Sequence, residues 1–306
     1  LSPRSIPRTA AAIALAVATV FGGTALAEVA GAEPLPTETN EPTETTETTD
    51  EAVGNDVFEA QPVPFWTEST AGLSVGGTYT PIVARLNDTG FDSIIWYAPG
   101  SATDYLWLAQ PGGGWDKIPL PTQVNGTYTP LVGDFAGNGL DDVFWYAPGA
   151  AADYLWTSNG GGFDSQPKPV SGTYLPEVLD DKVGHDDILW AKPGGGTGYV
   201  WAFEVAGAHL STPIVSPPGS IPLVGHFSEG VCADVFWYAA GPGEDELANL
   251  SCNGQVTGAS SQTVNGHYDP VVADFTHYGD GLDDILWQQH PGWSFVWEST
   301  GLHSWD

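Results

Sequence analysis

The stretch that decides the fold is Gly126-Thr127-Tyr128-Thr129-Pro130-Leu131-Val132-Gly133-Asp134-Phe135. Related phrases begin at Gly77, Gly172, Gly219 and Gly266. The proline of the phrase falls at positions 81, 130, 176, 222 and 270, so the copies are spaced by 49, 46, 46 and 48 residues. Self-similarity at a fixed period of this length is the signature of a repeat architecture.

Two further phrases recur within each repeat. An aromatic run such as Val143-Phe144-Trp145-Tyr146 follows each copy, and a run such as Tyr154-Leu155-Trp156 follows about ten residues later in four of the five. These short runs are rich in β-formers and bounded by Pro-Gly or Gly-Gly, which predicts four short strands per repeat of about 47 residues. No stretch after residue 60 has the sustained 3.6-residue periodicity of a helix.

The second predicted strand is apolar at every position, which indicates a sheet buried on both faces. Stacked blades in a ring bury both faces of each sheet. We therefore predict an all-β fold, a β-propeller of four-stranded blades, with five blades favoured over six. Residues 55–75 look like a worn copy of the repeat. We expect Leu73-Ser74-Val75 to supply the outer strand of the last blade and so close the ring.

The loop after the first strand carries a family resemblance. Asp134-Phe135-Ala136-Gly137-Asn138-Gly139-Leu140-Asp141-Asp142 resembles the signature loop D-x-[DN]-x-[DN]-G-x-x-D of the FG-GAP (VCBS) repeat. The resemblance spans about residues 77–306 and implies a calcium-binding loop, because alternate oxygen ligands around a glycine turn suit a hard cation. It assigns side-chain ligands to Asp134, Asn138 and Asp142 and a carbonyl ligand to Leu140. Ala136 occupies a ligand position and cannot serve.

The fifth copy has a related loop, longer by two residues, in which the matching carboxylates are Asp274, Asp280 and Asp284. The other three copies depart from the pattern, for example with Arg85 in place of the first acid of copy one. The resemblance thus predicts one or two Ca²⁺ sites. The alternative is that Asp and Asn side chains close these loops by internal hydrogen bonds, as in ordinary turns.

A second candidate site lies at the start of the third strand. A sugar presents an apolar face and a rim of hydroxyls, so an aromatic ring beside a carboxylate can receive it. The stretches Asp104-Tyr105-Leu106-Trp107 and Asp153-Tyr154-Leu155-Trp156 provide this combination. The alternative places the aromatic rings between blades as packing and lets the carboxylates close turns. The candidate ligand-binding residues are Asp104, Tyr105, Trp107, Asp153, Tyr154 and Trp156.

The two ends of the chain and its net charge limit the functions that are possible. Residues 1–27 combine Arg4 and Arg8 with an apolar run and Ala25-Leu26-Ala27, the pattern of a cleaved signal peptide. Residues 28–60 hold ten acidic and no basic residues among Thr and Pro, so we expect a disordered linker. Residues 61–306 form the predicted propeller with a net charge near −23. Such a surface repels phosphate backbones and anionic head groups, so neither nucleic-acid binding nor membrane insertion is expected.

The two cysteines, Cys232 and Cys252, both fall in copy four. In an exported protein, two lone cysteines within one blade predict a disulfide.

No arrangement of catalytic residues stands out, so the sequence favours a secreted, non-catalytic binding module. Its expected partner is an extracellular glycan or protein, with calcium-stabilised loops and an extracellular or cell-surface location. A structural spacer of the cell envelope is the main alternative, and a polysaccharide-cleaving enzyme is a weaker one.

Overall fold

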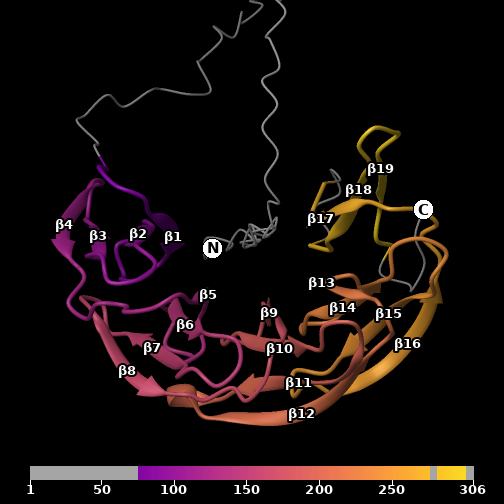
Figure 1. The fold of residues 1–306 in the computed structure, drawn as a ribbon, viewed down its shortest axis with the longest axis horizontal. Helices are drawn as coiled ribbons and strands as arrows, with labels where there is room; N and C mark the ends of the chain where they lie inside the picture. The colour runs from indigo at the N-terminus through magenta and orange to yellow at the C-terminus, as the bar shows by residue number, and fades with distance from the viewer. Residues whose placement is uncertain (1–74, 276–280, 301–306) are drawn as a thin grey trace, which may run out of the picture. The chain divides into compact units, whose positions relative to one another are not determined.

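The computed structural model describes residues 75–275 and 281–300. These residues form an all-β, five-bladed β-propeller (Figure 1). Four of the sheets have four strands and the fifth has three, and all the pairings are antiparallel. The predicted signal peptide and linker lie outside the described residues. No helix in the described ranges is long and apolar enough to span a membrane.

Each blade uses its strands in chain order, from the inside of the ring to the outside. Blade I contains β1 (Thr80–Ala84), β2 (Ser93–Tyr97), β3 (Tyr105–Ala109) and β4 (Trp115–Pro119). Blade II contains β5 (Thr129–Gly133), β6 (Asp142–Tyr146), β7 (Tyr154–Ser158) and β8 (Phe163–Pro167). Blade III contains β9 (Leu175–Leu179), β10 (Asp187–Ala191), β11 (Gly196–Phe203), the 3-10 turn η1 (Val205–Gly207) and β12 (His209–Ser216). Blade IV contains β13 (Ile221–Gly225), β14 (Asp234–Tyr238), β15 (Asp245–Leu250) and β16 (Val256–Gln262). Blade V contains β17 (Asp269–Ala273), β18 (Asp284–Gln288) and β19 (Phe295–Trp297).

The first strands lie next to one another around the inside of the ring, in the order β1, β5, β9, β13 and β17 (Figure 1). The recurring Pro-x-Val phrase forms these inner strands. The fourth strands β4, β8, β12 and β16 lie on the outside of the ring. The predicted outer strand of the last blade falls partly beyond the described residues: Leu73 and Ser74 are outside them, and Val75 is exposed and belongs to no strand.

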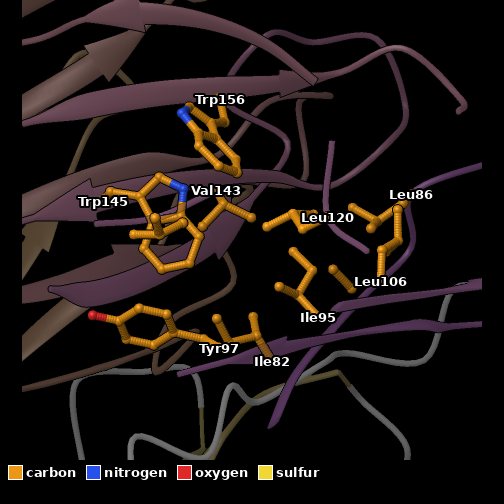
Figure 2. Packing of buried hydrophobic residues seen from close by; sticks show 11 residues of the cluster. Ile82, Leu86, Ile95, Tyr97, Leu106, Leu120, Val143, Trp145 and Trp156 are labelled. Atoms are coloured by element: carbon orange, nitrogen blue, oxygen red, sulfur yellow. The ribbon is translucent and has the colours of Figure 1, made fainter. Parts of the chain in front are cut away.

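The core is made between blades rather than within them. All five residues of β6 are buried, as are those of β10 and β14, which confirms sheets covered on both faces. In the interface between blades I and II, Ile82 and Ile95 of blade I lie near Val143 and Trp145 of blade II (Figure 2). Equivalent clusters join blades II to III, III to IV and IV to V.

The two edges of each blade differ in their loops. The Pro-Gly edge holds the loops between second and third strands, which contain Pro99-Gly100 in blade I and Pro148-Gly149 in blade II. The Asp-loop edge holds the loops between first and second strands, which carry the FG-GAP-like pattern in blades II and V. A candidate site on one edge is therefore repeated around the same side of the ring.

Candidate functional site

The Asp loop of blade II is closed by its own side chains. Asp134 accepts hydrogen bonds from the backbone N–H groups of Asn138 (2.9 Å) and Gly139 (2.7 Å). The Asn138 side-chain oxygen accepts one from the Leu140 N–H (2.8 Å), and its amide nitrogen donates to the Ser158 carbonyl (3.0 Å). Each side-chain oxygen of Asp134 and Asn138 thus already accepts an N–H group, as in Asx turns.

Asp142, the last acid of the pattern, fixes the blade from within. Its side chain is fully buried, and its two oxygens accept the N–H groups of Ala136 and Ser158, both at 2.8 Å. Burial raises the pKa of Asp142 to about 7, although the two N–H groups act in the opposite direction. Asp142 therefore ties the start of β6 to the end of β7.

The aspartate that precedes Asp142, and its equivalents in blades III and V, tie these blades to the preceding ones. The Asp141 Oδ2 accepts the Arg85 N–H at 2.5 Å, and the Asp141 N–H donates to the Arg85 carbonyl at 2.8 Å. Asp186 makes the same two bonds to Asp134, and Asp283 makes them to His226. In each Asp-Asp pair, the first aspartate therefore joins two neighbouring blades, and the second joins segments of its own blade.

The loop of blade II holds only part of the oxygen set that calcium needs. Among the described residues, the group of three Asp, Glu, His or Cys ligand atoms within 4.8 Å of one another is Asp181, Cys232 and Cys252. Its two sulfurs already form a disulfide. Calcium needs six to eight oxygens facing one point, and Ala136 supplies none. The side-chain oxygens of Asp134, Asn138 and Asp142 each accept one backbone N–H group and keep a second lone pair. Calcium at this loop stays a prediction.

The fifth-copy loop is described only in part. Asp280 lies outside the described residues, and Asp274 is exposed. Asp284 is buried like Asp142, and its two oxygens accept the N–H groups of Phe275 (3.0 Å) and Ser299 (2.9 Å). The last acid of the pattern therefore has the same fastening role in blades II and V.

At the Pro-Gly edge, the structure separates the candidate ligand-binding residues into two groups. Asp104 is fully buried, and its oxygens accept the N–H groups of Ala98 (2.8 Å) and Val124 (2.7 Å). Asp153 makes the equivalent bonds to Ala147 and Val170, both at 2.7 Å. Both carboxylates are buried. Each one joins its Pro-Gly loop to the linker that leads into the next blade.

The two tryptophans are packing residues. Trp156 is buried between blades and packs against Trp145 with ring centroids 5.4 Å apart. Trp107 is also buried, and the Lys117 ammonium lies 4.2 Å from its ring centroid. The structure thus gives Trp107 and Trp156 the role that the packing alternative assigned to them.

The tyrosines, in contrast, reach the surface. Tyr105 is 38% exposed and Tyr154 is partly exposed. Each starts the third strand of its blade, opposite the tryptophan of the second strand in the sheet register. The hydroxyls of Tyr105 and Tyr154 have no hydrogen-bond partner among the described residues. Two of the six candidates therefore expose part of an aromatic ring to solvent, and the ring of Tyr154 also packs against the core cluster between blades I and II.

The structure adds residues that the sequence argument missed. Tyr199, 38% exposed, takes the same position in blade III, and Phe295 takes it in blade V. The tyrosine of the Gly-x-Tyr phrase lies beside this position: Tyr79 packs against Tyr105 at 6.1 Å, and Tyr268 against Phe295 at 5.3 Å. The repeated Gly-x-Tyr phrase is the sequence pattern from which these aromatic residues could have been predicted.

An exposed aromatic residue also lies in the Pro-Gly loop of blade V. Trp293, between β18 and β19, is 90% exposed. Together with Tyr105, Tyr154, Tyr199 and Phe295 it forms what we call the aromatic edge. Blade IV has Glu246 at the strand position and does not contribute an aromatic side chain there.

The predicted disulfide between Cys232 and Cys252 is present, with a Cα–Cα distance of 5.0 Å. It joins the Asp loop of blade IV to the hairpin between β15 and β16. The link fastens the blade that lacks the Tyr-x-Trp strand.

No protein-family model and no curated protein matches the chain. Among solved structures, the chain is similar to an Agrocybe aegerita lectin, described as recognising non-reducing terminal N-acetylglucosamine, with 20% identity and a TM-score of 0.48. That alignment covers 75% of this chain and 61% of the lectin chain. The chain is also similar to the Photorhabdus luminescens Tc holotoxin pore, with 14% identity, a TM-score of 0.49, and coverage of 76% and 12%. Neither likeness, at these values, assigns a ligand to this chain.

Proposed function

We propose that this protein is a non-catalytic, multivalent carbohydrate-binding module, and that the aromatic edge is its binding surface. The observation that carries this proposal is the repetition of a part-exposed tyrosine on the third strand of blades I, II and III, at the position that pairs with the tryptophan of the second strand. A packing role alone does not need a free phenol at each of these positions.

The chemistry of the repeated position suits a sugar. A tyrosine ring offers an apolar face for the C–H face of a pyranose, and its hydroxyl donates and accepts hydrogen bonds with sugar hydroxyls. In blades I and II, the backbone that carries the ring is fixed by a sheet and by a buried carboxylate, Asp104 or Asp153, that bonds to the blade linker. A preorganised ring loses little conformational entropy on binding.

Charge narrows the class of glycan. The chain carries a formal net charge of −31, so sialylated, sulfated or uronic-acid glycans are repelled. Neutral glycans on an extracellular surface therefore fit best. Export is part of the proposal, and the disulfide supports it because such bonds persist in oxidising compartments.

A glycan array probed with the full chain tests this proposal. We expect binding to neutral glycans and loss of that binding in the triple variant Tyr105→Ala, Tyr154→Ala, Tyr199→Ala. The matched control is Phe91→Ala, which removes a 50% exposed ring from the Asp-loop edge. Binding of the triple variant at the wild-type level, or no bound glycan for the wild type, contradicts the proposal. Turnover of a polysaccharide panel would contradict its non-catalytic part.

A further inference from the structure

Neighbouring blades pack through alternate residues of their second strands. In the interface between blades I and II, Ile95 and Tyr97 of β2 pack with Val143 and Trp145 of β6 (Figure 2). The interfaces between blades II and III, III and IV, and IV and V use the same positions. Each interface therefore takes the third and fifth residues of one second strand and the second and fourth residues of the next. All of these side chains are at most 2% exposed.

Blades I and V are the two ends of this series, and each keeps one face that lacks such cover. Ile94 and Trp96, the second and fourth residues of β2, and Leu286, the third residue of β18, are only partly buried. On the inner strands, Val83 of blade I is 57% exposed and Val271 of blade V is 45% exposed. Within the described ranges, no core cluster joins blade V to blade I. We call these surfaces the end faces: that of blade I is formed by Val83, Ile94 and Trp96, and that of blade V by Val271, Leu286 and Val296.

The linker into blade I has the conformation of a linker that leaves a preceding blade. Gly126, Gly172 and Gly266 have φ angles of 141°, 127° and 152°. The carbonyl of each accepts a hydrogen bond from a tyrosine hydroxyl of the preceding blade. Gly77 has a φ of 125°. The described chain thus enters blade I in the way in which it enters blades II, III and V.

The sequence just before the described residues repeats the pattern of a second strand. Asp56-Val57-Phe58 is identical to Asp142-Val143-Phe144 of β6 and to Asp234-Val235-Phe236 of β14. This match assigns Val57 to the second position, which packs on the preceding blade in the described interfaces. It assigns Phe58 to the third position, which packs on the following blade. Residues 28–54 contain no aromatic residue, so the match begins where aromatic residues return.

We infer that residues 55–74 dock on the two end faces as one further, partial sheet of the same repeat, with Phe58 toward blade I and Val57 toward blade V. Burial of apolar side chains drives this docking, as it does at the four interfaces between blades. This segment leads directly into blade I, so its effective concentration at the end faces is high. A second copy of the chain is disfavoured as the cover, because each copy carries a formal net charge of −31. The worn copy as a whole then closes the ring, rather than Leu73-Ser74-Val75 alone.

Thiol labelling of the full chain tests this inference, because the two native cysteines are joined in a disulfide and do not react. Val83→Cys and Val271→Cys each place a thiol on an end face. Val215→Cys is the control on the outer strand β12, where the valine is 66% exposed. A covered face opens through a minor state populated at about 10% or less, so both end-face variants should react with a maleimide at least about tenfold more slowly than the control.

A second substitution identifies the cover. Adding Phe58→Ser to Val83→Cys should speed its labelling by about tenfold, because the change removes the side chain assigned to that face. Adding Glu51→Ser, which lies outside the docking segment, should leave the rate unchanged. Equal labelling rates for the three cysteine variants overturn the inference, because the end faces are then open. Slow labelling that Phe58→Ser does not change also overturns it, as does slow labelling that depends on protein concentration, which would make a second copy the cover. Glycan binding plays no part in this test, so its outcome is separate from that of the proposed function.

Discussion

The hydroxyl of Tyr97 accepts a 2.9 Å hydrogen bond from the backbone N–H of Tyr128, and it donates one of 2.9 Å to the Gly126 carbonyl. One phenol thereby ties the end of β2 to the linker into blade II. Tyr146 and Tyr238 make the same pair of bonds to the next blades. Gly126 has a φ of 141°, and a Cβ there would approach the Tyr128 ring to 2.9 Å, so glycine is required in the phrase.

Tyr97→Phe should lower the free energy of unfolding by about 1–2 kcal/mol, because it leaves the part-buried Tyr128 N–H without its partner and removes one of the two hydrogen bonds to the Gly126 carbonyl. Urea denaturation measures this loss. Tyr105→Phe is the control, since its hydroxyl has no partner among the described residues, and it should be neutral. Equal stability of the two variants would show that the Tyr97 bonds do not hold the blades.

Asp104→Asn should destabilise the fold by about 2–3 kcal/mol, because an amide nitrogen would face one of the two N–H groups that the carboxylate now accepts. Asp116→Asn, on the exposed strand β4, should stay within about 0.5 kcal/mol of the wild type. Binding per folded molecule to any glycan ligand should be unchanged in Asp104→Asn. A loss of binding without a loss of stability would restore Asp104 as a ligand contact.

Glu177 lies on inner strand β9, at the position held by Ile82, Leu131, Leu223 and Val271 in the other blades. Burial raises its pKa to about 7. A carboxyl whose folded-state pKa is raised contributes stability that is complete below its unfolded pKa and is lost as the pH rises through about 7.

Glu177→Leu should therefore be more stable than the wild type by about 1–3 kcal/mol at a pH of about 8. The difference should shrink as the pH falls toward about 4.5. Taking the difference between the two proteins cancels the other buried acids, such as Asp186, whose pKa burial raises to about 7. A pH-independent difference would mean that Glu177 is not buried in its charged form.

The Cys232–Cys252 bridge closes a loop with a sequence separation of 20. On the chain-entropy model, replacing both cysteines by serine should cost about 3 kcal/mol of unfolding free energy. Denaturation of the double variant against the wild type, both without reductant, measures it. Two titratable thiols in the native wild-type protein would contradict the bridge itself.

The repeat made the fold predictable, because each of its five copies indicates the same pattern of strands. The aromatic run at 143–146 predicted a strand buried on both faces, and β6 is such a strand. The extent of blade III was harder to predict. β11 begins at Gly196, inside a run of glycines that local propensity marks as a loop, and pairs over eight residues with β12. Sheet pairing overrode that propensity.

The site was less predictable than the fold, because the sequence does not show where an oxygen points. Asp104 and Asp142 lie in patterns that suit a ligand and a metal ion, yet the oxygens of both accept backbone N–H groups. Such bonds join segments 6 to 20 residues apart along the chain. Tyr105 and Trp107 lie on the same face of their strand, and only the folded ring shows that the tryptophan is covered and the tyrosine is not.

The last prediction follows from the repetition of the aromatic edge around the ring. Several weak sites on one rigid body bind a glycan-coated surface with an effective concentration set by their spacing, so avidity exceeds single-site affinity by about 10²–10⁴. Tyr154→Ala should therefore weaken binding to a dense glycan surface much more than binding to a soluble monovalent sugar. Surface plasmon resonance at high and low glycan density, beside calorimetry with the monosaccharide, measures both quantities. Phe91→Ala should alter neither. If Tyr154→Ala weakens surface and solution binding by the same factor, the blades do not act together, and a single blade carries the site.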